Sequence, residues 1–251
     1  MSWSELAAEL DEWALAGRRA EFWWRDDDAV ADTPELDLLL RCAGPTPVAL
    51  AVIPGLVETS LPDKLAQHPA VTVLQHGWRH HNHAAEGPNS EYPAGRDLRE
   101  VATEFADGRR RLREYFPDHY IPVFVPPWHG FDDSYFLALQ AAGLSAFSRK
   151  GARTAARMGE LYLTNIHCVP ILWTDPPSFD DDETYLGVLL DHLRGKRNGV
   201  LDTDEPTGFL THHLVQNEQS YEFMSRLSQM IWAHPAAIWL DARHIFGFDV
   251  Q

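Results

Sequence analysis

The sequence predicts one α/β domain built on parallel strands. Short apolar segments alternate with longer amphipathic segments about six or seven times along the 251 residues. The strand-like segments are apolar throughout, as expected for parallel strands that helices cover on both faces. Polar clusters follow directly after several of them. A barrel and a doubly wound open sheet both account for these observations within one domain.

The elements can be assigned in chain order. The first helix is expected over residues 4–15, with Ser4 as its cap, and the aromatic segment 21–24 indicates a strand. Thr33 followed by Pro34 marks the start of the second helix, because Thr caps helices and Pro fits their first position. Further strands are expected at 48–53, 71–74, 121–125, 144–148, 166–172, 209–211 and 237–240. Further helices are expected at 61–67, 96–115, 132–142, 183–193 and 218–232.

The composition restricts the partners and the compartment. Asp and Glu number 37 against 21 Lys and Arg, which gives a net charge of −16. A surface this acidic repels phosphate backbones and anionic lipids, so neither nucleic acid nor a membrane is an expected partner. The N-terminal residues lack a signal-peptide pattern, and Cys42 and Cys168 do not form a disulfide framework. We therefore expect a cytoplasmic protein, and the sequence leaves its oligomeric state open.

Polar clusters at the ends of four predicted strands indicate a site. In barrels and open parallel sheets, the C-terminal strand ends are where ligands and catalytic groups gather. The clusters are Arg25-Asp26-Asp27-Asp28, His76-Gly77-Trp78-Arg79-His80, Pro126-Pro127-Trp128-His129 and Thr211-His212-His213.

The first two clusters favour a metal ion. Three adjacent carboxylates at 26–28 repel one another unless a cation compensates them; the alternative is an acidic turn that leads into the helix at Thr33. His76 and His80 are four residues apart, which on a helical turn places both on one face. Two imidazoles and a carboxylate can hold one divalent ion, whereas the alternative is a polar surface loop. Four histidines within 76–83, directly after an apolar strand, favour the metal site.

The other two clusters suit substrate contact and proton transfer. Trp128 offers a flat apolar wall for a ligand ring, although Pro126-Pro127 alone would explain a rigid turn. A histidine at the end of the late strand can protonate a leaving amine or alkoxide, or can be a half-buried structural residue.

Taken in order, these motifs resemble the polysaccharide deacetylases, carbohydrate esterases that remove acetyl groups from chitin-like and peptidoglycan sugars. The resemblance spans residues 22–214. It implies a distorted (β/α)7-like barrel of parallel strands with helices outside. The whole chain, 1–251, would be one catalytic domain with an N-terminal helix at 1–18 and the barrel at 20–250. It also implies a metal-dependent hydrolase of an acylated sugar or related small molecule, with one divalent metal ion, zinc being the expected one.

The resemblance also assigns roles to residues. Asp27 corresponds to the catalytic base, and His212 to the late catalytic histidine; the alternatives are the pair Asp26-Asp27 and His213. The residues that correspond to the metal ligands are Asp28, His76 and His80. Trp128 and His129 lie on the Pro-Pro-aromatic turn and are expected to contact the substrate.

This sequence departs from the family's pattern at three positions, one of which is the family's glycine after the Asp pair, which is missing here. Val125 stands where the family has an arginine that orients the catalytic Asp, and His129 stands where it has a glycine. We hypothesise that Arg25 supplies the missing cation, and we place it with the substrate-contacting residues. Two other functions remain open: a catalytically silent carbohydrate-binding protein, and an iron(II) oxygenase with a two-histidine, one-carboxylate site.

Overall fold

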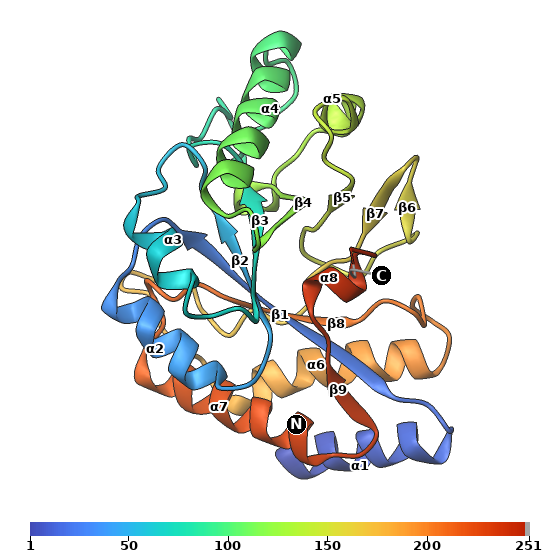
Figure 1. The fold of residues 1–251 in the computed structure, drawn as a ribbon. Coiled ribbons are helices and arrows are strands. Elements are labelled where there is room, and N and C mark those ends of the chain that lie inside the picture. The colour runs from blue at the N-terminus through green and yellow to red at the C-terminus, as the bar shows by residue number, and fades with distance from the viewer. Residues whose placement is uncertain (249–251) are drawn as a thin grey trace.

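The computed structural model describes residues 1–248 and contains a nine-stranded sheet in the order β6-β7-β5-β4-β3-β2-β1-β8, with β9 beside β1 (Figure 1). All paired strands are parallel except the antiparallel pair β6 and β7. The strands are β1 (Ala20–Ala29), β2 (Val48–Val52), β3 (Val71–His76), β4 (Tyr120–Val125), β5 (Ala146–Phe147), β6 (Arg157–Met158), β7 (Leu161–Leu163), β8 (Thr207–Thr211) and β9 (Ala237–Trp239).

The segment 166–168 joins the two sides of the sheet into a barrel. Ile166 bridges the chain at Lys150, just beyond β5, and Cys168 bridges Phe209 in β8. Backbone hydrogen bonds from Ile166 N to Arg149 O (2.9 Å) and from Leu210 N to Cys168 O (2.8 Å) hold this seam. The predicted parallel barrel with outer helices is therefore confirmed, although this short irregular segment takes the place of one of its seven strands.

Helices surround the strands. Helices α1, α2, α6 and α7 gather on the side of β1, β8 and β9, whereas α4 and α5 lie beyond β3, β4 and β5 (Figure 1). The helices are α1 (Trp3–Leu15), α2 (Pro34–Ala43), α3 (Ser60–Leu65), α4 (Leu98–Tyr115), α5 (Phe136–Ala141), α6 (Asp182–Arg197), α7 (Glu218–Ala233) and α8 (Ala242–Ile245). None of the helices in the described part is both long and apolar enough to cross a membrane.

Side chains alternate along β1 between two apolar clusters. Phe22 and Trp24 belong to the large core between the sheet and the helices, and Trp23 belongs to a smaller cluster inside the barrel. Strand alternation places Arg25 and Asp27 on the same face as Trp23. The interior face of β1 thus carries an apolar floor, then a cation, then a carboxylate toward its C-terminal end.

The structure corrects four details of the sequence prediction. Ser2, not Ser4, caps α1. The predicted strand at 166–172 is reduced to isolated bridges, in a segment that contains Pro170. The hairpin of β6 and β7 and the short helix α8 were not predicted, because neither carries a long periodic pattern. The division into a helix at 1–18 and a barrel at 20–250 stays a prediction, and its limit at residue 250 lies outside the described residues.

Candidate active site

A cavity of about 450 Å³ opens at the C-terminal ends of the barrel strands. Its position follows from the parallel topology, which brings these strand ends together at one mouth. Seven residues singled out in the sequence line it, together with four that were not. The lining residues are Asp27, Asp28, His76, His80, Trp128, His129, Lys150, Val169, Ile171, Trp173 and His212.

Asp28, His76 and His80 form a set of convergent ligand atoms. Nε2 of His76 lies 3.2 Å from Oδ1 of Asp28, and Nε2 of His80 lies 3.3 Å from the same oxygen. This buried oxygen has no hydrogen-bond partner. Nδ1 of His76 lies 3.1 Å from the carbonyl oxygen of Val125, which can only accept a hydrogen bond. The Nδ1–H therefore donates there and leaves the Nε2 lone pair facing Asp28, as a metal ligand requires.

Burial and neighbouring charges shift the pKa of each of the three residues in this set. Burial alone would raise the pKa of Asp28, but the contact with His76 and the charges of the nearby imidazoles hold it far below its usual range. Burial alone would lower the pKa of His76, yet the charges of Asp27 and Asp28 outweigh it and raise that pKa. The pKa of His80 is lowered by burial and by the charge of His76. These residues fit a divalent cation, because it would satisfy the orphaned oxygen and both imidazoles at once.

A loop, rather than the predicted helical turn, brings the two histidines together. Residues 77–80 are irregular, and both Gly77 and His80 have left-handed backbone angles (φ +55° each). The buried carboxylate of Glu91, which the sequence gave no reason to select, accepts hydrogen bonds from the backbone N–H groups of Trp78 (3.0 Å) and Arg79 (2.8 Å). Glu91 therefore fixes the turn that carries His80 toward His76.

Gly77 is required by this arrangement, and Gly77→Ala is expected to be costly. A Cβ there would lie 1.9 Å from Oε2 of Glu91 and 2.7 Å from Pro127 Cγ. Gly17→Ala is the matched control, since Gly17 also has a positive φ (+65°) but open space around it. We expect Gly77→Ala to lower the free energy of unfolding in urea by about 1–3 kcal/mol more than Gly17→Ala does. If both variants lost the same free energy of unfolding, Glu91 and Pro127 would have to move away from the new Cβ at no energetic cost.

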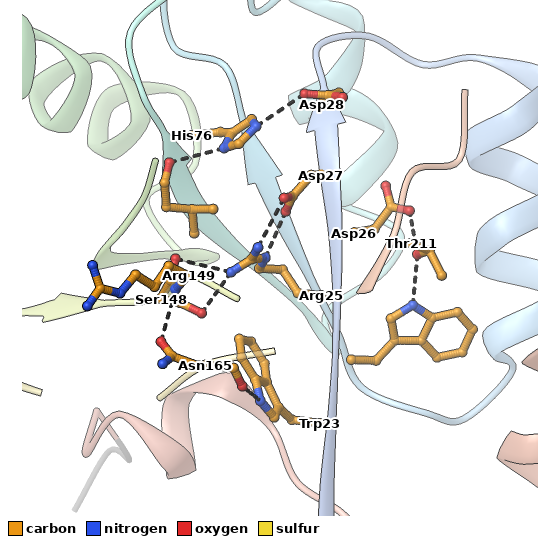
Figure 2. Close-up of polar contacts among 12 residues, drawn as sticks. Trp23, Arg25, Asp26, Asp27, Asp28, His76, Ser148, Arg149, Asn165 and Thr211 are labelled. Carbon is orange, nitrogen blue, oxygen red and sulfur yellow. Dashed lines mark hydrogen bonds and ion pairs between the residues drawn. The ribbon is translucent and has the colours of Figure 1, made fainter. Parts of the chain in front are cut away.

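Asp27 is held by Arg25 inside the barrel. Nε and Nη2 of Arg25 donate to the two carboxylate oxygens of Asp27 at 2.8 and 3.1 Å, and Nη1 donates to Oγ and O of Ser148 at 2.7 and 3.2 Å (Figure 2). The side chain of Arg25 is 0% exposed and does not line the cavity. The prediction that Arg25 contacts substrate is therefore wrong. Its fork positions Asp27 instead, in the role hypothesised for it in place of an arginine at residue 125.

The third carboxylate, Asp26, faces the other side of β1. Figure 2 shows Asp26 pointing toward Thr211 and away from Asp27. Its Oδ2 accepts from Thr211 Oγ1 (2.6 Å), and its Oδ1 lies 2.5 Å from Nδ1 of His213. His213 is buried on Asp26, whereas His212 lines the cavity. The geometry thus favours Asp27 over Asp26, and His212 over His213, as residues that can reach a substrate.

Left-handed backbone angles gather around the cavity. Among the described residues, the non-glycine residues with positive φ are Asp28, His80, Trp128 and His129, and all four line it. Each such angle costs about 1–3 kcal/mol and persists only where the surroundings enforce it. At Asp28 (φ +72°) it breaks the alternation of β1, so that Asp27 and Asp28 both reach the cavity.

Two tryptophans wall the cavity. Trp128 packs on His80 with ring centroids 4.1 Å apart, and Trp173 meets His212 edge-on at 4.9 Å. Their side chains remain 38% and 63% exposed, so they offer faces to a ligand. Beside them, burial and the charge of Arg25 lower the pKa of His129 to about 3 and keep its imidazole neutral. Trp173, like Lys150, was missed because it lies in a segment with no periodic pattern.

A second group of potential ligands, His167, His192 and Glu205, is fully buried elsewhere in the barrel. Here Nδ1 of His167 accepts a hydrogen bond from Gly208 N (2.9 Å), and Nδ1 of His192 lies 3.0 Å from Thr207 Oγ1, whereas Nε2 of both rings is buried without a hydrogen-bond partner. Glu205 accepts from the backbone N–H groups of Arg153 and Asn165. Glu205 thus links the start of β8 to the neighbouring backbone by hydrogen bonds, while the two unpartnered Nε2 atoms beside it make this group a second place that could hold a metal ion.

Comparison with solved structures identifies the fold. A protein assigned as a polysaccharide deacetylase from Mycobacterium smegmatis superposes with a TM-score of 0.56 and 14% identity, over 91% of this chain and 90% of that one. The chain has the polysaccharide deacetylase fold. Peptidoglycan deacetylase PdaC from Bacillus subtilis shares it, with a TM-score of 0.51 and 12% identity over 92% and 91% of the two chains.

A third structure with the polysaccharide deacetylase fold is a mutant of a carbohydrate esterase family 4 pseudoenzyme with restored activity. It gives a TM-score of 0.52 at 13% identity, over 86% of this chain and 62% of that chain. Neither protein-family models nor curated proteins matched the sequence. At these identities the likeness shows the fold, and the chemistry must be argued from the side chains.

Proposed function

We propose that the protein is a metal-dependent hydrolase that removes an acetyl or similar acyl group from a sugar or a related small molecule. One observation carries the proposal. A carboxylate held ionised by a buried arginine, Asp27, lies beside the convergent ligand atoms of Asp28, His76 and His80 in a single cavity. A base next to a cation site is the arrangement that hydrolysis by an activated water requires.

Each residue has a chemical task in this mechanism. Asp28, His76 and His80 would hold a divalent ion, with zinc as the expected one, and this ion would supply positive charge to polarise an acyl carbonyl and acidify water. Asp27 accepts the proton of the attacking water on a carboxylate oxygen. Its bond to Arg25 fixes the carboxylate in place, so that little reorganisation is needed when the proton arrives.

His212 serves the departing group. It stands directly after β8, lines the cavity, and packs edge-on against the ring of Trp173. From there it can donate a proton to the leaving amine or hydroxyl. Trp128 and Trp173 provide flat apolar surfaces suited to the faces of a sugar ring.

A catalytically silent carbohydrate-binding protein is the second candidate. The same fold includes a pseudoenzyme, and Val125 departs from the family's arginine. The Arg25–Asp27 pair argues against silence, because a buried charge pair is hard to explain as a relic. An iron oxygenase with the same ligand types is disfavoured by the parallel barrel.

Acetate release tests the proposal. The protein, loaded with zinc or cobalt, is incubated with a panel of N- and O-acetylated mono- and oligosaccharides, and acetate is measured. Release that stops when a chelator removes the metal and returns with added zinc supports a hydrolase. Tight sugar binding without acetate release from any member would support the silent alternative.

Arg25→Met is expected to shift the acidic limb of the pH–activity profile to higher pH. Burial alone would raise the pKa of Asp27, but the charge of Arg25 outweighs it and lowers that pKa. Removing Arg25 therefore raises the folded-state pKa, and Asp27 becomes protonated and inactive at a higher pH. The lowered pKa also stabilises the fold above the unfolded value near 4, and this contribution is lost as pH falls.

The same variant leaves a buried carboxylate unpaired. We expect the free energy of unfolding at neutral pH to fall by about 3–5 kcal/mol. Arg25→Lys is the matched control, since it keeps the charge but loses the two-pronged grip. It should restore most of the acidic limb but only part of the turnover. An unchanged profile in Arg25→Met would show that Arg25 does not control Asp27.

A further inference from the structure

The cavity has an unpaired cation at its edge. Lys150 lines it, and its side chain is exposed. Among the described residues, no carboxylate lies within ion-pair distance (4.0 Å) of its Nζ. Its charge is therefore available to a ligand, and its position on the cavity wall, rather than its lack of an ion pair, makes it a candidate binding residue.

A second cavity of about 380 Å³ continues from Lys150 and shares it as a lining residue. Arg149 and Arg153 also line this side cavity, and no acidic side chain does. Arg153 is neutralised by Asp202 at 2.8 Å. Arg149 has only a long contact of 3.9 Å with the exposed Asp133. Lys150 and Arg149 therefore give the side cavity a positive field.

The charges inside the main cavity do not need Lys150. Asp27 is compensated by Arg25, and Asp28 has the two histidines and the cation site. Lys150 and Arg149 follow β5 along the seam, whereas the reacting groups stand on β1 and β3. Their charge is thus free to meet a part of the substrate that does not react.

We propose that Lys150, with Arg149, binds an anionic group of the substrate, so that the substrate is an acylated sugar or related molecule bearing a carboxylate or phosphate. This inference rests on the proposed hydrolase function for the meaning of the main cavity. Lys150 lines both cavities and would meet the anion where they adjoin, while Arg149, which lines the side cavity, adds positive charge there. The charge selects substrates by attraction and by salt-sensitive steering.

The test compares matched neutral and anionic probes. N-acetylglucosamine, its 6-phosphate and N-acetylmuramic acid are offered to the metal-loaded protein, with acetate release and calorimetric binding as the two readouts. We expect kcat/KM to favour an anionic probe at low salt, with the phosphate and carboxylate arms identifying which anion fits. Lys150→Ala should reduce that preference about tenfold, through KM. Lys150→Glu should reverse that preference. Arg110→Ala is the surface control, which removes one positive charge as Lys150→Ala does, and it should leave the preference unaltered.

The outcomes separate this inference from the hydrolase proposal. If acetate is released equally from neutral and anionic sugars and Lys150→Ala changes nothing, the anion site is refuted while the hydrolase stands. If no sugar releases acetate but the anionic probes bind with a Lys150-dependent Kd, the anion site stands and the hydrolase fails. If no probe binds in preference to the neutral sugar, the anion site is refuted.

Discussion

Asn in place of Asp27 is expected to lower kcat by about 10²–10⁴-fold while bound metal stays at about one ion per chain. An amide cannot take the proton of the attacking water, yet it keeps the shape of the carboxylate and one of the two hydrogen bonds from Arg25. The ligand atoms of Asp28, His76 and His80 are untouched. Turnover of an acetylated sugar and metal analysis of the same sample give the two numbers.

Asp26→Asn is the matched control, one residue away on the opposite face of β1. Asp26 is bound to Thr211 and His213 and does not line the cavity, so its loss should weaken the fold before it weakens the chemistry. The folded fraction should retain most of its kcat. The assignment of the base would be wrong if Asp27→Asn turned over normally and Asp26→Asn did not.

Alanine at His76 or at His80 is expected to weaken metal binding by more than about 100-fold and to abolish hydrolysis. Each variant removes one of three convergent ligands, and such losses exceed the 10–100-fold typical of the groups that only support a ligand. Elemental analysis after dialysis against a weak chelator measures the effect. Circular dichroism checks that the barrel remains folded.

Two histidine controls locate the metal. His81→Ala changes an exposed histidine of the same loop, which packs on His83 rather than on the ligands, and should keep the metal. His192→Ala disturbs the buried group with His167 and Glu205 and should also keep it, at a cost in stability. If metal survived in both His76→Ala and His80→Ala but disappeared in His192→Ala, the buried group would be the metal site.

The sequence patterns were sufficient to predict one domain of parallel strands and helices, because its strands are apolar throughout and its helices carry clear caps and periodicity; the choice of a barrel over an open sheet came from the family resemblance. Thr33 caps α2 with Pro34 at its first position, as predicted. The clusters at strand ends also came together as predicted, since parallel topology leaves no other place for them. These features follow from local sequence patterns: apolar strands, capped helices and polar residues at the ends of strands.

The details of the site depend on irregular backbone, which sequence patterns do not encode. Simple alternation would put Asp27 and Asp28 on opposite faces of β1, and only the left-handed angle at Asp28 brings both to the cavity. The helical turn expected between His76 and His80 is a loop fixed by Glu91. Arg25 was assigned to substrate because nothing in the sequence tells an inward strand position from an outward one.

Some residues of the cavity lie on regular strands, and others lie beside the irregular seam at 166–168. Asp27 and Asp28 stand at the end of β1, within an irregularity that is flanked by regular pairs with β2, and His76 pairs with Val125 in the ladder of β3 and β4. Lys150, Ile171 and Trp173 adjoin a segment joined to its neighbours by single bridges. Substitutions and insertions near the seam can therefore accumulate without disturbing the proposed base and metal ligands on β1 and β3, because loops tolerate change that paired strands do not. In evolutionary terms, the barrel can exchange one substrate for another while inheriting its chemistry intact.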